Sequence, residues 1–270
     1  MLTLDVALIP YDRTPGFGPD HLLARLQRGD LTDAFPAFTA DHPHQPLASE
    51  FLNRAALADK LVATNAAYGN PLPDSTVAAI RSDGIFIIAG QQPGLLLGPM
   101  YTLLKAISAL ALARQLRDRV NVPVIPAFWI ASEDHDLAEV NHVTITGRRF
   151  TCQHDQLKSP GPLPPVANIS LTQFKPDLIA FLEQQLPNRP HKPWVLDQIK
   201  SIAFDNYPTM FAQLLTRVLG DEQIVLIDPM AMRELTAPVI AAALDRHEAI
   251  QSAFDTGRQQ LAAAGFTPPL

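Results

Sequence analysis

Ile85-Phe-Ile-Ile-Ala89 and Val124-Ile-Pro-Ala-Phe-Trp-Ile130 are the two stretches that decide the fold. Both are continuous apolar runs, which are typical of strands covered on both faces in a parallel sheet. The residues between them have helical periodicity, and Pro99 favours a helix start close to it. This order predicts a right-handed βαβ unit. Because Pro126 has no N–H to donate, we expect the second strand to have an unpaired side there.

The helix between the two strands carries two lines of side chains. The apolar line is expected to face the sheet and comprises Met100, Leu103, Leu104, Ile107, Leu110 and Ala111. Tyr101, Lys105 and Ser108 lie together on a second line at i, i+4 and i+7.

Further elements are predicted around this unit. Helices are expected after Asp20 through Leu26, over 48–68, over 76–81 with Asp74 or Ser75 as cap, over 171–186, over 194–219 and over 231–264. Strands are expected over 142–146 and 223–228.

Composition narrows the class of protein. The chain has 270 residues, of which 47% are hydrophobic and 18% charged, as expected for a soluble globular protein. A net charge of −6 without a dense Lys/Arg run argues against a nucleic-acid partner. Neither a signal peptide nor an apolar run of about 20 residues is present, so we expect a cytoplasmic protein without a membrane partner. The single cysteine, Cys152, excludes an internal disulfide, and its role is left open.

A glycine-rich loop follows the first strand. It holds Gly90, Gln91, Gln92, Gly94 and Gly98. A glycine loop that opens a helix can present N–H groups to an anion, and Lys105 would add a positive charge two turns later. The pattern matches neither a Walker A nor a GxGxxG motif, so an ordinary strand-to-helix turn is the alternative.

An acidic cluster follows the second strand. It comprises Glu133, Asp134, His135, Asp136, Glu139 and His142, with Asn141 among them. Carboxylates at a sheet edge favour acid/base roles or amine binding. If the segment is helical, His135, Glu139 and His142 share a face that could hold Zn²⁺ or Mn²⁺. A solvated helix start is the alternative. Asp228 ends a third strand in the same manner, either as a site residue or as a turn residue.

Two long blocks resemble one family. They are Gly90-Gln-Gln-Pro-Gly-Leu-Leu-Leu-Gly-Pro-Met-Tyr-Thr-Leu-Leu-Lys-Ala-Ile-Ser108 and Pro126-Ala-Phe-Trp-Ile-Ala-Ser-Glu-Asp-His-Asp-Leu-Ala-Glu-Val-Asn-His142, with Val225-Leu-Ile-Asp-Pro229 as a third. They are similar to the signature blocks of the bacillithiol biosynthesis cysteine-adding enzymes, the BshC cysteine ligase family, over its N-terminal half.

The resemblance implies an α/β fold with a Rossmann-like parallel core of the nucleotidyltransferase type and a helical coiled coil used for dimerisation. The divisions it suggests are an N-terminal helical region (1–82), the first part of the core (83–150), a Pro-rich, helical connecting-peptide-like insertion (151–220), a further core strand (221–230) and a long helix that starts the coiled coil (231–270). It also implies a ligase that joins cysteine to glucosaminyl-malate through an amide, the last step of bacillithiol synthesis. ATP with Mg²⁺ enters only by analogy with class I aminoacyl-tRNA synthetases, so the cofactor is left unknown.

Carried onto this chain, the resemblance assigns roles to both loops. The glycine loop would face an anion, and Tyr101 and Lys105 would orient malate carboxylates or a phosphate. Asp134, His135 and Asp136 would hold the amine or act as bases, with Glu139, Asn141 and His142 in support. The attacking amine must lose a proton, and His135 is the first choice for that base.

Family members are about twice this length. The later core strands and most of the coiled coil are therefore expected beyond residue 270, which would leave an unpaired sheet edge in this chain. Two other functions stay open. One is a metal-dependent hydrolase that uses His135, Glu139 and His142, and the other is a non-catalytic half-protein that needs a partner chain.

Overall fold

The computed structural model describes residues 21–28, 53–158 and 161–267. The chain forms two compact units. One unit is Asn53–Leu235, and the other combines Met1–Leu52 with Thr236–Leu270.

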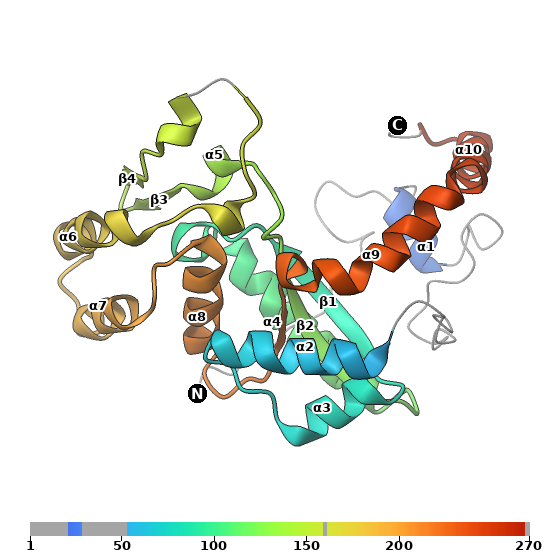
Figure 1. Cartoon of the computed structure of the whole chain (residues 1–270), viewed down its shortest axis with the longest axis horizontal. Helices are drawn as coiled ribbons and strands as arrows, with labels where there is room; N and C mark the ends of the chain where they lie inside the picture. The colour runs from blue at the N-terminus through green and yellow to red at the C-terminus, as the bar shows by residue number, and fades with distance from the viewer. Residues whose placement is uncertain (1–20, 29–52, 159–160, 268–270) are drawn as a thin grey trace. The chain divides into compact units, whose positions relative to one another are not determined.

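The larger unit is built on a parallel sheet of three strands in the order β1-β2-β5 (Figure 1). These strands are β1 (Ile85–Gln91), β2 (Val124–Ile130) and β5 (Val225–Ile227). Their bounds confirm that the continuous apolar runs are parallel strands, of which β2 is buried almost throughout and β1 only partly. The expected unpaired side at Pro126 is also confirmed, because β5 pairs with β2 only from Ala127 to Trp129.

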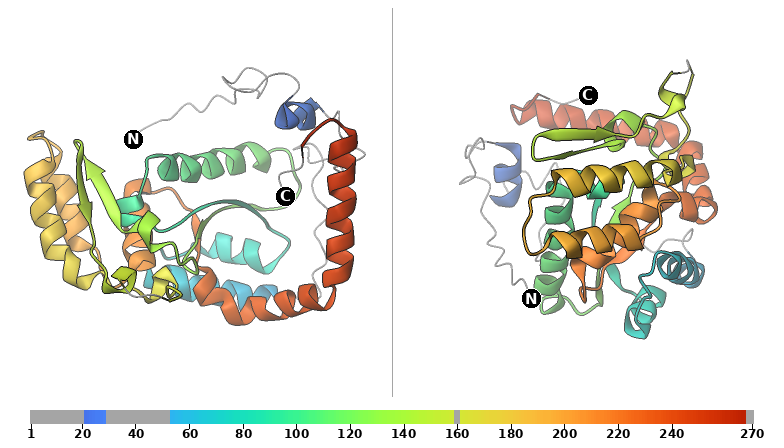
Figure 2. Two further views of the ribbon diagram at one scale, coloured as in Figure 1. Left: turned by 90° about the horizontal axis from the view of Figure 1, so that it is seen from above. Right: turned by 90° about the vertical axis from the view of Figure 1, so that its left-hand side faces the viewer.

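Helices cover both faces of this sheet, as the views in Figure 2 show. They are α4 (Tyr101–Arg117) on one face, and α2 (Arg54–Ala67) and α3 (Asp74–Arg81) on the other. Alternate residues of β2 serve the two faces, since Phe128 and Ile130 join the core under α4 while Ile125 and Ala127 join the core under α2 and α3. The arrangement is the two-sided helical cover expected of a parallel sheet.

The buried face of α4 differs from the expected one. Its buried residues are Thr102, Ala106, Ala109, Leu110 and Ala113. Met100 and Leu104 are instead 72% and 53% exposed, so the prediction that they face the sheet is wrong. Small side chains let the helix axis approach the strands closely, while Leu104 and Leu112 turn outward and Leu110 stays buried. The line of Tyr101, Lys105 and Ser108 is exposed.

Helix starts follow their capping residues. Asn53 caps α2 by accepting the Ala56 N–H at 3.0 Å. Neither Asp74 nor Ser75 caps α3, because Asp74 is already its first helical residue and Pro73 occupies the cap position without a side-chain bond.

The segment between β2 and β5 forms a two-stranded antiparallel sheet and a set of helices. The strands are β3 (His142–Ile145) and β4 (Arg148–Thr151), and the α-helices are α5 (Leu137–Val140), α6 (Lys175–Gln185), α7 (Lys192–Ser201) and α8 (Tyr207–Leu219). Short 3₁₀ helices cover Leu95–Leu97, Asp155–Lys158, Val166–Asn168 and Thr172–Phe174. Pro176 and Pro193 lie in the first turns of α6 and α7, where the missing N–H is harmless.

The chain after β5 is helical. It forms α9 (Pro229–Asp245) and α10 (His247–Ala263), with a break at Arg246 instead of the single long helix expected there. In the smaller unit, α1 (Leu22–Arg28) confirms the expected helix, and Arg25 donates to the Ala264 carbonyl at 3.2 Å. Asp20, its expected cap, lies outside the described residues, as do the residues 48–52 predicted to begin α2.

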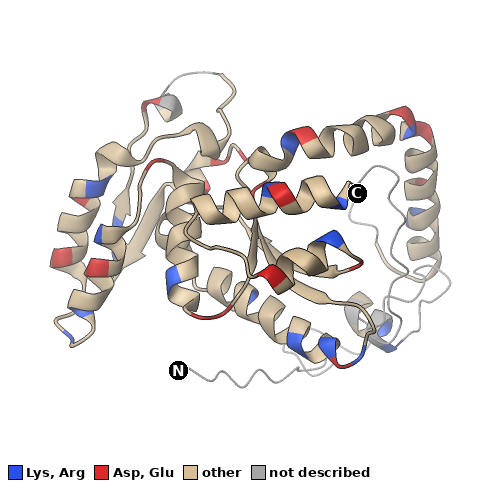
Figure 3. Ribbon diagram, turned by 60° about the horizontal axis from the view of Figure 1, so that its bottom comes forward, with Lys and Arg blue, Asp and Glu red and all other residues tan. Residues whose placement is uncertain are grey.

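Residues of both charge signs occur among the described helices, but α4 carries only Lys and Arg (Figure 3). None of the described helices is both long enough and apolar enough to cross a membrane.

Candidate functional site

The three parallel strands end at one edge of the sheet, where ligands bind in open α/β folds. At this edge lie the loop Gln92–Gly98 after β1, the loop Ala131–Asp136 after β2, and Asp228 after β5. The structure therefore brings together the glycine loop and the start of the acidic cluster, as the sequence predicted.

The glycine loop has a tightly folded backbone. A Cβ at position 94 would lie 2.9 Å from the Gly98 Cα, so Gly94 allows the loop to close on itself. Gly98 has a φ of 66°, and the non-glycine residues Leu96 and Leu97 also have positive φ values of 52° and 74°. Such conformations are uncommon outside glycine and are held here by the buried side chains of Leu95 and Leu97.

The backbone N–H groups of this loop are already bonded within it. Gly94 donates to the Gln92 carbonyl at 2.8 Å, and Gly98 donates to the Leu95 carbonyl at 3.1 Å. In this conformation the Gly94 and Gly98 N–H groups cannot also donate to an anion. A positively charged side chain is then the group that would bind an anion at this loop.

Lys105 supplies that cation. Its ammonium group donates to the Gln91 side-chain oxygen at 2.8 Å and to the Gly90 carbonyl at 3.2 Å. The Gln91 amide nitrogen donates in turn to the Tyr101 hydroxyl at 3.0 Å, and the ammonium lies 5.0 Å from the centre of the Tyr101 ring. Tyr101 and Lys105 of α4 thus form one connected cluster with Gly90 and Gln91 at the end of β1.

Gln92 connects the glycine loop to the acidic loop. Its amide nitrogen donates to Asp134 Oδ2 at 2.6 Å. Asp134 Oδ1 also accepts the backbone N–H groups of His135 at 2.6 Å and Asp136 at 3.1 Å. Partial burial raises the pKa of Asp134, but these hydrogen bonds outweigh it and hold the pKa below its usual range. Asp134 is therefore a fixed anion near neutral pH and a weak proton acceptor.

The other members of the acidic cluster do not converge. The His135 side chain is 76% exposed, and its Nδ1 lies 3.9 Å from Asp134 Oδ1. Asp136 caps α5 by accepting the Glu139 N–H at 3.2 Å. Glu139 is exposed on that short helix.

The helical face proposed for a metal does not form. Helix α5 covers only Leu137–Val140, while His135 precedes it and His142 belongs to β3. Across the described parts of the chain no group of three His, Cys, Asp or Glu side chains could hold a metal ion. The i, i+4, i+7 relation failed because Asp136 starts the helix after His135.

Asn141 and His142 have local partners. The buried Asn141 side chain donates to the Cys152 carbonyl at 3.4 Å, and its backbone carbonyl accepts the Cys152 N–H at 2.8 Å. His142 Nδ1 lies 3.2 Å from the Ala138 carbonyl. These three contacts hold the junction between α5 and β3, and none of them points to a ligand.

Asp228 forms a buried network that the sequence only partly indicated. It accepts a hydrogen bond from Tyr68 at 2.5 Å and another from Ser132, and it caps α9 by accepting the Met230 N–H at 3.0 Å. Burial, together with the Asp228 carboxylate, raises the pKa of the Tyr68 hydroxyl above its usual value. The strand-end position of Asp228 was a usable signal, but nothing in the sequence indicated Tyr68 or Ser132. Ser132 directly precedes Glu133, the first residue of the acidic cluster, so this network fixes where that cluster begins.

A separate polar group lies around Cys152. His154 Nε2 is 2.8 Å from the Tyr207 hydroxyl, and both residues are buried. Burial raises the pKa of the Cys152 thiol to about 12. This thiol is therefore protonated and unreactive at neutral pH.

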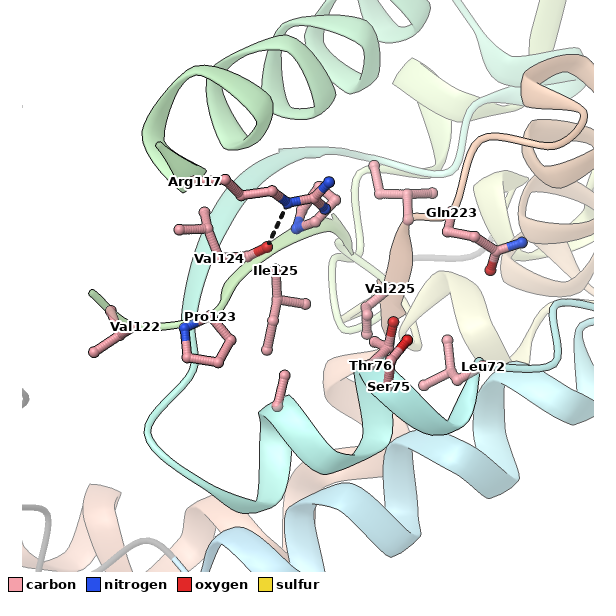
Figure 4. A pocket seen from close by; sticks show the side chains of 13 residues that line it. Leu72, Ser75, Thr76, Arg117, Val122, Pro123, Val124, Ile125, Gln223 and Val225 are labelled. Atoms are coloured by element: carbon pink, nitrogen blue, oxygen red, sulfur yellow. Dashed lines mark hydrogen bonds between the residues drawn. The ribbon is translucent and has the colours of Figure 1, made fainter. Parts of the chain in front are cut away.

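The opposite, N-terminal edge of the sheet also has a hollow, of about 280 Å³ (Figure 4). Ser75, Thr76 and Gln223 line it together with Arg117, whose Nε donates to the Val124 carbonyl at 3.4 Å. None of the residues predicted for the site lies there.

The sheet and its helical cover define a Rossmann-like α/β domain, with polar groups gathered at the C-terminal strand ends. The chain belongs to the BshC family: residues 34–270 match the family described as bacillithiol biosynthesis BshC, N-terminal Rossmann-like domain.

Curated relatives agree with this assignment. Those of Heliobacterium modesticaldum, Bacillus mycoides and Staphylococcus carnosus all carry the name "Putative cysteine ligase BshC". The first is 29% identical over 97% of this chain, the second 30% over 71%, and the third 33% over 67%. The chain spans 47%, 37% and 35% of their respective lengths, which is less than half of each.

Proposed function

We propose that this chain provides the strand-edge site of a cysteine ligase of bacillithiol biosynthesis, which joins cysteine to glucosaminyl-malate through an amide bond. The observation that carries the proposal is the linked pair of clusters at this edge. The cation of Lys105 and the fixed anion of Asp134 are held by the consecutive residues Gln91 and Gln92. An acceptor that carries carboxylates at one end and an amine at the other matches this pair in charge.

The groups divide the work as follows. Lys105 and Tyr101 bind the malate carboxylates, and Gln91 orients both of them. Asp134 holds the glucosamine ammonium until it loses a proton. The pKa of Asp134 is lowered, which makes this carboxylate a weak proton acceptor, so we assign the proton to the exposed imidazole of His135, whose Nδ1 lies 3.9 Å from Asp134 Oδ1. The free amine then attacks the activated carboxyl carbon of cysteine, the C–N bond forms, and the group that activated the carboxyl leaves.

ATP with Mg²⁺ could activate the cysteine carboxylate by analogy with related ligases. The glycine loop does not fit a backbone cradle for its phosphates here, because the Gly94 and Gly98 N–H groups are bonded to the loop's own carbonyls. Acceptor binding, proton transfer and attack by the amine are therefore all assigned to residues of this chain and not to ATP.

We also place a homodimer contact on the helices after β5. Large apolar side chains are exposed there, namely Val239, Ile240, Leu244, Ile250 and Phe254. Sedimentation equilibrium tests this contact: the parent chain should have the mass of a dimer, and the Leu244→Asp variant that of a monomer. Equal masses for the two proteins would contradict it.

Acceptor binding is tested first by thermal melting of the purified chain. A ligand that binds only the folded protein stabilises it, so glucosaminyl-malate at ten times its Kd should raise Tm by about 3 °C or more. Lys105→Met and Asp134→Asn should each abolish the shift, while Glu133→Gln in the same acidic loop should retain it. A wild-type Tm unchanged by saturating glucosaminyl-malate would contradict the proposal.

The proton transfer is tested in an enzyme of full family length. His135→Ala should lower turnover steeply and leave Tm unchanged, since its side chain is 76% exposed. Full activity of that variant would remove His135 from the role. The metal-dependent hydrolase lacks its proposed ligand face, because His135 precedes α5 and His142 belongs to β3.

A further inference from the structure

Asp228 has more hydrogen-bond donors than a helix cap requires. Its Oδ1 accepts the N–H groups of Met230 at 3.0 Å and Ala231 at 3.4 Å, which is the ordinary bonding of an aspartate at a helix start. Tyr68, directly after α2, and Ser132, shortly after β2, add two hydroxyl donors from other parts of the chain. A cap needs neither of these donors, so the two hydroxyls indicate a second role for this carboxylate.

Ser132 is bonded through both its side chain and its backbone. Its hydroxyl donates to Asp228 and accepts the Met230 N–H at 3.2 Å. Its backbone N–H donates to the Ile130 carbonyl at 2.6 Å, and its own carbonyl accepts the Ala167 N–H at 3.1 Å. Since all polar groups of this buried residue are bonded, the path of the chain as it leaves β2 is fixed.

Asp134 lies two residues beyond this anchor. Its backbone carbonyl accepts the Val166 N–H at 2.8 Å, beside the contact between Ala167 and Ser132. Its carboxylate accepts the Gln92 amide at 2.6 Å from the other loop. The backbone that Ser132 anchors therefore sets where the Asp134 carboxylate can lie and which donors it can reach.

The three residues of the anchor are too buried to bind a ligand themselves. Tyr68 is 9% exposed, Asp228 6% and Ser132 0%. We propose that they are positioning residues, which hold the Asp134 carboxylate where the ammonium group of the acceptor binds. This role rests on the acceptor site proposed above. Because a hydrogen bond weakens steeply when its distance and angle leave their preferred ranges, a displaced Asp134 would bind the ammonium less tightly.

The Tyr68 hydroxyl is suited to this task. Burial, and after it the Asp228 carboxylate, raises the pKa of this hydroxyl above its usual value. The hydroxyl therefore keeps its proton, and its bond to Asp228, throughout the neutral pH range. The position of the acidic loop should then not change with pH in this range.

Tyr68→Phe tests the role with a small change, because it removes one buried hydroxyl and keeps the ring that packs in the core. Tyr207→Phe is the matched control. Tyr207 is buried in the same core, and its hydroxyl lies 2.8 Å from Nε2 of His154, which is not part of the acidic loop. Each variant loses a buried hydrogen bond, so both should have a lower Tm than the parent chain.

The first readout is the Kd for glucosaminyl-malate, measured by isothermal titration calorimetry. Tyr68→Phe and a second variant, Ser132→Ala, should each raise the Kd about fivefold or more, whereas Tyr207→Phe should leave it within about twofold of the parent value. Binding by Tyr68→Phe and Ser132→Ala that is as tight as binding by Tyr207→Phe would overturn the proposal, because the network would then serve stability alone.

The second readout reports on Asp134 without any acceptor. The backbone amide of His135 and the side-chain amide of Gln92 both donate to its carboxylate, which moves the NMR signals of their protons downfield. Both signals should move upfield in Tyr68→Phe and keep their positions in Tyr207→Phe. A general loss of stability would affect the two variants alike.

Together the two readouts separate the positioning role from the acceptor site. A parent chain that does not bind glucosaminyl-malate would refute the acceptor site, while signals that still move in Tyr68→Phe would retain the positioning of Asp134. Signals that stay in place in Tyr68→Phe would overturn the positioning role, whether or not the acceptor binds. Signals that move while the Kd is unchanged would overturn the role of this network in binding.

Discussion

At the strand edge, hydrogen bonds to a single residue, Asp134, lower the pKa of its carboxyl group. Asp134 accepts the Gln92 amide and two backbone N–H groups, while its neighbour Glu133 is exposed. The sequence grouped both in one acidic cluster, because it shows the density of carboxylates but not which of them receives donors.

Asp134→Asn should reduce stability in a pH-dependent manner. Because the folded-state pKa is lowered, the ionised carboxylate stabilises the fold above the unfolded pKa of about 4, and this contribution is lost as the pH falls through the folded value. Urea unfolding should therefore show a gap between wild type and variant at pH 7 that narrows below pH 4. Glu133→Gln is the control, and an equal gap at both pH values would contradict this explanation.

The reactivity of Cys152 tests whether this single side chain is buried. Burial raises its pKa to about 12, so at pH 8 the thiolate that reacts with iodoacetamide is rare. We expect slow alkylation of the native chain and rapid alkylation in urea, measured by intact mass. The chain has a single cysteine, so each added mass reports on this position alone. Rapid modification under native conditions would show that the thiol is accessible.

The elements differ in how far the sequence predicted them. Strands β1 and β2 followed from continuous apolar runs, because burial on both faces demands such runs. The face of α4 did not, because leucines at helical spacing outweigh alanines in any apolar pattern. Only the close approach to the sheet makes Ala106 and Ala113 the buried residues. The hydrogen bond from the Asn65 amide to the Leu226 carbonyl of β5 was equally hidden, since the two residues are 161 positions apart.

The orientation of α4 can be tested by size changes on its two sides. Ala106→Leu should destabilise the fold by about 1–3 kcal/mol, because Ala106 is fully buried and an added side chain overpacks the interface. Leu104→Ala, on the exposed side, should change the free energy of unfolding by no more than about 0.5 kcal/mol. Urea denaturation of both variants measures the difference. A larger loss for Leu104→Ala than for Ala106→Leu would restore the face that the periodicity predicted.

At the scale of the whole molecule, both hydrophobic core clusters lie in the larger of the two compact units. Both core clusters consist of residues between Tyr68 or Ala58 and Met232, all within the unit Asn53–Leu235. The strand-edge residues, from Gln91 to Asp228, belong to that unit as well. The helices from residue 236 onward carry mostly exposed side chains, and α10 has no buried residue. Stability and the candidate site should therefore reside in the larger unit.

A chain limited to residues 53–235 should thus fold cooperatively, because it retains every buried residue of the two clusters. Thermal melting followed by circular dichroism should give a Tm within about 5 °C of the 270-residue chain, since losing about 1 kcal/mol shifts a domain of this size by only a few degrees. The same short chain should keep the Tm increase with glucosaminyl-malate, because Lys105 and Asp134 remain. A non-cooperative melt would show that the larger unit depends on residues outside it. A cooperative melt without the ligand shift would show that residues 53–235 fold but do not bind the acceptor on their own. Acceptor binding would then require residues outside this range.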